Sequence, residues 1–282
     1  LSLPLCRTML LFACPRQPPM STVFPPHAVS CLRTSRLLRS TRPFLARGGP
    51  SGERCAGCRL ILSHCICAWR TVVTTRAGVC LLMAEHETLK PSNTGWLIAD
   101  VVPETRAFGW ARTTVDPELL ALLADPQWQP YVVFPGEFVA PERVVSQLLT
   151  EAGDQASEVA NNKRPLFILL DATWPEARKI FKKSPYLNSF PVLSLTPDQL
   201  SRYRLRRSRR DDHLCTSEVA ALCLALSGDN LASQVLEAYL DVFTEHYLCA
   251  KQQLKIDSDD EVHQRLGQLR AQTEIAITLK SG

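Results

Sequence analysis

The chain has 282 residues, of which 45% are hydrophobic and 21% are charged, which is ordinary for a globular protein and excludes a disordered or fibrous chain. The formal net charge is +4, but residues 1–52 hold seven arginines and no Asp, Glu or Lys, so the other 230 residues carry 25 basic and 28 acidic side chains. An anionic partner therefore has to bind a local basic patch, because the body of the chain is not basic.

The cysteines and the lengths of the apolar runs indicate the cellular compartment of the protein. A secreted disulfide scaffold is shorter and has more evenly spaced cysteines than the 11 in this chain. No apolar run approaches the roughly 18 residues that a membrane-spanning helix needs. We therefore expect a reduced, cytoplasmic protein that has no membrane segment and no evident protein partner.

The N-terminal residues 1–34 are rich in proline and show no helical or alternating apolar period. An acid-free leader with arginine and serine is typical of an organelle transit peptide. The alternative, which we favour, is a disordered extension or a start site placed too far upstream. Residues 35–75 are expected to hold a short basic helix, over residues 35–47, and then a cysteine cluster.

That cluster consists of Cys55 and Cys58, followed by Cys65 and Cys67. Four thiolates within thirteen residues suit tetrahedral zinc, and a site with four protein ligands is structural because no position stays open. His64 could replace one cysteine, and four free or redox-active thiols are the remaining alternative. The cluster therefore predicts a small metal-binding lobe before the main domain.

Residues 76–256 alternate between short apolar runs and helical patterns, and residues 257–282 are expected to be a C-terminal tail. The apolar runs predict buried strands at residues 79–83, 107–110, 131–134, 166–170 and 192–195. Helical patterns cover residues 92–98, 116–123, 141–149, 175–181, 216–226 and 231–250. Ser92 and Asp116 are the expected caps of the first two helices. This order predicts an α/β fold with a parallel sheet covered by helices on both faces.

In such sheets ligands bind beyond the carboxyl ends of the strands, which directs attention to Pro135, to residues 171–174 and to the loop after residue 195. No glycine-rich dinucleotide loop, Walker loop, metalloprotease helix or nucleophile elbow is present. Asp171 follows five apolar residues, where a carboxylate is costly unless it has partners or a function. The other explanation is that Asp171 or Thr173 caps the helix that follows.

A basic stretch is the second unusual feature, since residues 202–210 hold six arginines together with Tyr203. A solvated surface explains such a run, and so does a phosphate-binding loop in which the tyrosine stacks on a base. Arg178 and Lys182 add positive charge on the helix after Asp171. Because both stretches follow strand ends, we favour a nucleic-acid substrate.

These motifs resemble the DTW-domain family, which is named for an Asp-x-Thr-Trp signature that here reads Asp171-Ala172-Thr173-Trp174. Five further stretches match in the same order: the cysteine cluster, residues 90–95, residues 133–135, residues 203–206 and residues 215–220. The similarity runs from about residue 41 to about residue 254. The chain looks most like the bacterial members, which are tRNA-uridine aminocarboxypropyltransferases.

The resemblance implies a fold similar to SPOUT methyltransferases, with a C-terminal knot that holds S-adenosylmethionine. It also implies a reaction, in which the 3-amino-3-carboxypropyl group moves to N3 of a tRNA uridine, in the variable loop in the bacterial case, and methylthioadenosine is released. The alternatives are a SPOUT-like RNA methyltransferase and a non-catalytic RNA-binding module that uses zinc and arginine.

The chemistry of the implied reaction and the placement of the basic residues suggest roles for individual residues. Asp171 is expected to accept the imide proton or to orient the methionine amine, and Trp174 to wall the pocket or stack on a base. The residues expected to line the cofactor site are Pro135, Leu170, Thr173, Tyr203, Leu205, Arg206 and Thr216. The residues expected to bind tRNA are Arg178, Lys182, Arg204, Arg207 and Arg209.

Overall fold

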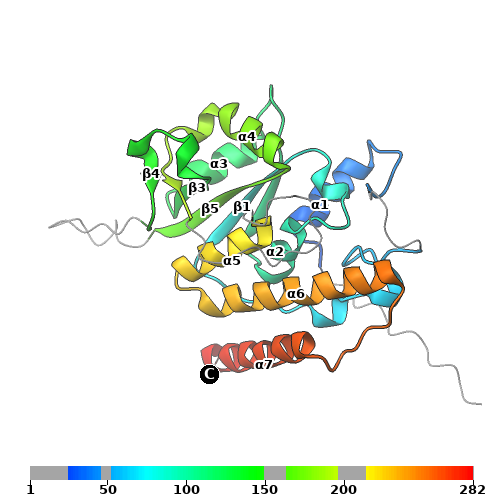
Figure 1. Ribbon diagram of the computed structural model, residues 1–282. Coiled ribbons are helices and arrows are strands. Elements are labelled where there is room, and N and C mark those ends of the chain that lie inside the picture. Colours follow the sequence, from blue (N-terminus) through cyan, green and yellow to red (C-terminus); the bar gives the residue numbers. More distant parts are fainter. Residues whose placement is uncertain (1–24, 46–51, 149–162, 196–213, 282) are drawn as a thin grey trace, which may run out of the picture.

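The computed structural model describes residues 25–45, 52–148, 163–195 and 214–281, and a parallel sheet lies at its centre (Figure 1). Its strand order is β2-β1-β5-β3-β6-β4, and every neighbouring pair is parallel. The strands are β1 Gly78–Met83, β2 Thr105–Gly109, β3 Trp128–Val133, β4 Val144–Val145, β5 Arg164–Asp171 and β6 Val192–Leu193. The predicted α/β class is confirmed.

Helices cover both faces of this sheet, as the uninterrupted apolar strands predict. On one face α3 and α4 pack on the strands, and on the other face lie α2, α5 and α6 (Figure 1). The helices are α1 Ala28–Leu37, α2 Gly95–Val101, α3 Pro117–Ala124, α4 Trp174–Lys182, α5 Thr216–Leu226, α6 Asn230–Gln252 and α7 Glu261–Ser281.

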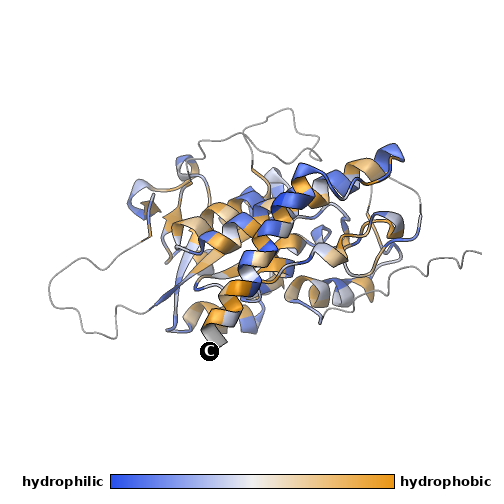
Figure 2. Ribbon diagram, turned by 90° about the horizontal axis from the view of Figure 1, so that it is seen from below, coloured by the Kyte–Doolittle hydropathy of each residue, from blue (hydrophilic) through white to orange (hydrophobic). Residues whose placement is uncertain are grey.

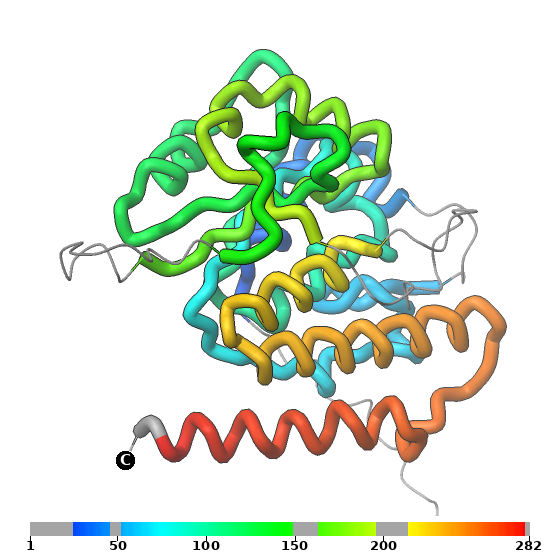
Figure 3. The backbone as a smooth tube through the Cα atoms, turned by 60° about the vertical axis from the view of Figure 1, so that its left-hand side comes forward, coloured from blue at the N-terminus to red at the C-terminus, as the bar shows by residue number. Residues whose placement is uncertain are grey.

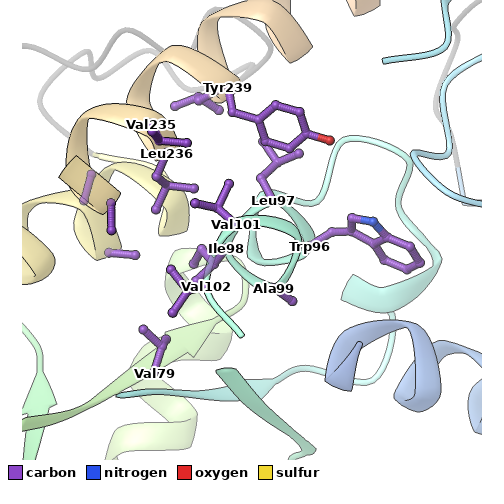
Figure 4. Packing of buried hydrophobic residues seen from close by; sticks show 14 of the residues in the cluster. Val79, Trp96, Leu97, Ile98, Ala99, Val101, Val102, Val235, Leu236 and Tyr239 are labelled. Atoms are coloured by element: carbon purple, nitrogen blue, oxygen red, sulfur yellow. The ribbon is translucent and has the colours of Figure 1, made fainter. Parts of the chain in front are cut away.

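The helix α2 is buried over all seven residues, so it forms the centre of the larger core cluster. In Figure 4 the α2 side chain Val101 points toward Leu236 of α6 and Leu97 lies beside Tyr239 of the same helix, while Val79 of β1 lies on the other side of α2. Apart from Asp100, which pairs with Arg70 and accepts from the hydroxyl of Tyr239, the helix carries only apolar side chains. A short helix of this kind is stable only inside a protein. The packing of α2 therefore fixes the loop that precedes it, residues 84–94.

Two helix caps explain where helices begin. Asp116 caps α3 as predicted, because its side chain accepts a hydrogen bond of 2.9 Å from the N–H of Glu118, and Pro117 occupies the first helical position. At α2 the predicted cap, Ser92, is wrong, because the N-cap residue is Thr94. The side-chain oxygen of Asn93, one residue earlier, accepts the N–H of Trp96 at 3.1 Å.

The predicted helix over residues 141–149 is also wrong in the described part, which ends at residue 148. Only Pro141–Arg143 forms a helical turn, and Val144–Val145 then pairs with β6 as the edge strand β4. Two consecutive β-branched residues favour a strand over a helix, and the neighbouring β6 supplies the backbone partners.

At the N-terminal side the fold begins before residue 35, so the predicted boundary at residue 34 is wrong for residues 25–34. The helix α1 covers Ala28–Leu37, where we expected a helix at residues 35–47. Its Val29 is fully buried, and Arg33 donates to the carbonyl of Thr88 at 2.9 Å. Tertiary packing thus stabilises a helix for which the sequence shows no clear apolar period. Residues 1–24 lie outside the described part.

At the C-terminal side the expected tail is a helix. α7 runs alongside α6, and the tube in Figure 3 shows α5, α6 and α7 as successive layers. Leu266 is fully buried against α6, whereas Ile275, Ile277 and Leu279 are exposed. Figure 2 shows this mixture of polar and apolar residues along α7. The sequence period is weak because only the first half of α7 contributes to the core.

Two further expectations concern the C-terminal knot and membrane-spanning helices. The expected C-terminal knot stays a prediction, because the connection from β6 to α5 includes residues 196–213, which lie outside the described part. Among the described residues, no helix is both long and apolar enough to cross a membrane.

A line of hydrogen bonds joins α6 to α7. His246 Nδ1 lies 3.0 Å from the carbonyl of His64, so this nitrogen must carry a proton, and His246 Nε2 lies 2.9 Å from His263 Nε2. His263 Nδ1 lies 2.7 Å from the carboxylate of Asp260. With His246 neutral, its Nε2 can accept a hydrogen bond from Nε2–H of His263. Burial lowers the pKa of His246 to about 4.

This depressed pKa predicts that the contribution of His246 to stability falls in mild acid. The folded state keeps His246 neutral, so its contribution is complete above the unfolded pKa of 6.5 and is lost as the pH falls toward 4. The loss should reach roughly 3 kcal/mol. Urea unfolding at several pH values measures it. H246N should flatten this dependence, while H86N, at an exposed histidine, should leave it as in the wild type. A pH dependence of H246N equal to that of the wild type would contradict the assignment.

Candidate active site

Asp171 is the last residue of β5, at the carboxyl edge of the sheet and beside Met83, which ends β1. Its side chain is only 3% exposed. One carboxylate oxygen accepts a hydrogen bond of 2.7 Å from the amide of Asn93, and the other accepts one of 2.7 Å from the hydroxyl of Thr216. The carboxylate therefore joins the loop before α2 to the first residue of α5.

The residue that caps α4 is Thr173 and not Asp171. Thr173 is the N-cap residue of α4, and its N–H and hydroxyl both donate to the carboxylate of Glu176, which forms a capping box. Asp171 instead bonds side chains from two other helices. The buried carboxylate is thus not required to start α4.

Close packing around Asp171 depends on Gly95. A Cβ atom at Gly95 would lie 2.4 Å from the Asp171 carboxylate oxygen, well inside van der Waals contact. The glycine in residues 90–95 therefore allows α2 to approach the strand end closely enough for the amide of Asn93 to reach the carboxylate.

The surroundings raise the pKa of both carboxyl groups in this region. Burial raises the pKa of Asp171, and the hydrogen bonds from Asn93 and Thr216 oppose that effect only in part. Burial also raises the pKa of Glu87 to about 7, with a further contribution from Asp171, although Lys90 pairs with Glu87. Perturbed carboxyl groups of this kind are typical of functional sites.

Sequence reasoning missed Glu87, which is only 6% exposed although it lies in the short 3-10 helix Glu87–Leu89 between β1 and α2. The available signal was its spacing of three residues from Lys90, inside a polar stretch that follows the buried β1 strand. A charged pair at that spacing is usually a surface pair, so the sequence alone could not show that this one is buried.

Trp174 lies on the other face of the sheet end. Leu170, Ala172 and Trp174 pack in the core cluster of α3 and α4, whereas Asp171 faces α2 and α5. The Trp174 ring stacks on Phe134 with 5.4 Å between ring centroids. Side chains alternate along a strand, which separates Asp171 from Leu170, and Trp174 begins α4, which covers the face of Leu170. The two residues of the DTW signature therefore have different surroundings.

Next to Trp174 the helix α4 presents basic and aromatic groups. The guanidinium of Arg178 lies 4.8 Å from the ring centroid of Phe138, which is 36% exposed, and Phe138 contacts Trp174 at 5.6 Å. Lys182 is exposed on the same helix. An accessible aromatic ring beside cationic side chains suits contacts with RNA.

Of the remaining predicted site residues, Pro135 belongs to the described part of the chain and six do not. Pro135 follows β3, where the hydroxyl of Ser194 accepts the N–H of Gly136 at 2.9 Å, so it lies at the same carboxyl edge of the sheet as Asp171. Six predicted residues lie outside the described part: Tyr203, Leu205, Arg206, Arg204, Arg207 and Arg209.

The four cysteines form one compact group. The sulfur atoms of Cys55, Cys58, Cys65 and Cys67 all lie within 4.8 Å of one another. The Cys55–Cys67, Cys55–Cys65 and Cys58–Cys65 sulfur pairs are 3.5, 3.5 and 3.6 Å apart. A tetrahedron of zinc–sulfur bonds of about 2.3 Å requires about 3.8 Å, while a disulfide requires about 2.05 Å. The group therefore fits a zinc ion bound by four thiolates.

Arg59, which follows Cys58, connects two segments. One is the cysteine loop, residues 55–67, and the other is the site loop, residues 84–94, which precedes α2. Arg59 has a left-handed backbone, with φ of 68°, and its side chain is fully buried. Its guanidinium donates to the carbonyls of Lys90 at 3.0 Å and of Asn93 at 3.1 Å and lies over the ring of Trp96. The metal-binding segment is therefore part of the main core, and the geometry of Asn93 depends on it.

Comparisons with known proteins agree with this geometry. The DTW domain family matches residues 52–248. A relative in Drosophila melanogaster, tRNA-uridine aminocarboxypropyltransferase 2, is 37% identical over 59 residues, which cover 21% of this chain and 24% of the relative. The matched segment therefore spans about a quarter of that relative. No solved structure matches the chain.

The cysteine geometry predicts that the protein purifies with about one zinc ion per chain and that C58S and C67S each lose most of it. The metal content by mass spectrometry measures this. C31S, at an exposed cysteine of α1, is the matched control and should keep full zinc content. Full zinc content in both C58S and C67S would contradict the site.

The contact at Gly95 predicts that G95A separates α2 from Asp171 and destabilises the fold by roughly 1–3 kcal/mol, the usual range for overpacking. The midpoint of thermal unfolding reports it. G267A is the matched control, because a Cβ at Gly267 meets no atom within 4 Å and alanine is favoured in the helix α7. A G95A variant as stable as the wild type would show that the helix is not held this closely.

Proposed function

Because the chain belongs to the DTW-domain family, we propose that it is a tRNA-uridine aminocarboxypropyltransferase that uses S-adenosylmethionine. The observation that carries the proposal is the family signature at a strand end, where its aspartate, Asp171, is buried and hydrogen-bonded by two helix starts. The name of the fly relative supports the same activity, although that match is short.

In the proposed reaction the 3-amino-3-carboxypropyl group moves from the sulfonium to N3 of a uridine, and methylthioadenosine leaves. We expect the uridine to lie in the variable loop of the tRNA. A sulfonium is already a good leaving group, so the protein has two tasks. It must direct the propyl carbon, and not the methyl carbon, toward the nucleophile, and it must remove the N3 proton.

The cofactor is proposed to bind at the carboxyl edge of the sheet. Pro135 and Thr216 lie at this edge, at the ends of β3 and at the start of α5, and Leu170 and Thr173 flank Asp171. The loop containing Tyr203, Leu205 and Arg206 would complete the site. In parallel sheets this edge is where ligands bind.

The tRNA is proposed to lie across the α4 side. Trp174 and Phe138 offer aromatic surface there, and Arg178 and Lys182 offer positive charge. Arg204, Arg207 and Arg209 would add phosphate contacts. Zinc at the four cysteines would hold the loop of Arg59 and take no part in the chemistry. We place the reaction in the cytoplasm.

D171A is predicted to abolish transfer because it removes the acceptor of both Asn93 and Thr216. The rate should fall at least 100-fold, the lower limit for a lost proton-transfer or positioning group. Transfer of label from carboxyl-labelled S-adenosylmethionine to unmodified tRNA measures it. D257N, at an exposed aspartate, is the matched control and should keep the wild-type rate.

Other outcomes of this assay decide between functions. Near-normal transfer by D171A would end the assignment of Asp171. Label retained from the methyl group and not from the carboxyl group would indicate an RNA methyltransferase. Binding of tRNA without any binding of S-adenosylmethionine in calorimetry would indicate a non-catalytic RNA-binding module.

A further inference from the structure

A continuous line of polar side chains leads from the surface to Asp171. Lys90 is at the outer end, with 30% of its side chain exposed, and it pairs with one carboxylate oxygen of Glu87. The other oxygen of Glu87 lies 3.4 Å from the amide nitrogen of Asn93, and the same nitrogen donates to Asp171 at 2.7 Å. Thr216 ends the line on α5.

The two carboxylates in this line are not equivalent. Both oxygens of Asp171 already accept hydrogen bonds, and the orientation of Asn93 is fixed because its oxygen accepts the N–H of Trp96. Glu87 has only a long contact to Asn93 and an ion pair with a partly exposed lysine. A lysine side chain on a flexible four-carbon stem can move away and expose its partner.

We propose that Glu87 accepts the proton from uridine N3 and that Asp171 is a positioning residue, which holds Asn93 and Thr216 at the strand end. This inference rests on the proposed function. The N3–H bond breaks and its proton binds the Glu87 carboxylate. The N3 electron pair forms a bond to the propyl carbon, and the electrons of the carbon–sulfur bond stay on sulfur, which becomes a neutral thioether.

The surroundings of Glu87 suit a group that takes up a proton near neutral pH. Burial and the charge of Asp171 raise its pKa to about 7, and Lys90 and the amide of Asn93 act in the opposite direction. Catalysis by a base is most efficient when its pKa lies near the working pH. Arg33 also faces this loop, but it donates to the backbone carbonyl of Thr88.

The loop that carries Glu87 is held rigidly by its backbone. Arg59 binds the carbonyls of Lys90 and Asn93, and Arg33 binds that of Thr88. The N–H of Leu45 donates to the carbonyl of Leu89 at 2.9 Å. Two buried arginines thus fix the position of Glu87 from the cysteine loop and from α1. Such support is what a reacting group requires, since small displacements are costly in rate.

The test is the single-turnover rate of aminocarboxypropyl transfer to unmodified tRNA, measured from pH 5.5 to pH 9 with the full-length zinc-loaded protein. The wild-type rate should rise with pH and level off above about 7, because only the ionised carboxylate of Glu87 can accept the proton. E87Q should be at least 100-fold slower, the lower limit for a lost base, and should lose this rise. Binding of S-adenosylmethionine by calorimetry shows whether E87Q is folded and loaded.

Two further variants shift the midpoint of the rise in opposite directions. K90M removes a positive charge that lowers the pKa of Glu87, so the midpoint should move to higher pH. D171N removes a negative charge that raises this pKa, so the midpoint should move to lower pH, at a reduced rate. These shifts would not follow if Glu87 and Lys90 only stabilised the fold.

The outcomes separate this inference from the proposed function. If wild-type protein transfers the group and E87Q keeps the wild-type rise, the Glu87 assignment is overturned while the function stands. A rise that is lost in D171N and kept in E87Q would return the role of base to Asp171. If the wild type transfers nothing to tRNA at any pH, the function and the inference both fail.

Discussion

The buried carboxylate of Asp171 is the interaction on which the site depends. A carboxylate that is 3% exposed at the end of an apolar strand is unfavourable unless it is hydrogen-bonded, and here the partners come from the loop before α2 and from the start of α5. Three segments that are far apart in sequence therefore meet at one point. Gly95 is needed there because any side chain would occupy the space of the carboxylate.

The cysteine group stabilises the surroundings of Asp171 indirectly. Arg59 connects it to the carbonyls of Lys90 and Asn93, and its guanidinium is buried against Trp96. Burial of a charged group is costly unless its donors find acceptors, and the two carbonyls accept from the two terminal nitrogens of Arg59. The position of the site loop and that of the cysteine loop therefore depend on each other. A metal ion held by the four cysteines would thus influence the surroundings of Asp171 without contacting them.

Sequence patterns predicted the sheet and most of its helices because buried parallel strands and capped helices leave local signals. They failed where distant contacts decide the structure. α1 and the first half of α7 are held by packing against the core, and residues 144–145 form a strand only because β6 lies beside them. Asp171 was predicted as a site residue, but its separation from Trp174 across the sheet required the fold. Glu87 was missed because its burial depends on distant contacts.

The central claim is that a strand-end carboxylate site in this chain alkylates a uridine with the aminocarboxypropyl group of S-adenosylmethionine. The most direct measurement is mass spectrometry of nucleosides from unmodified tRNA that has been incubated with the protein and S-adenosylmethionine. The account predicts uridine that carries a 3-amino-3-carboxypropyl group, together with an equal amount of methylthioadenosine. Methylated nucleosides with S-adenosylhomocysteine, or unchanged tRNA, would contradict it.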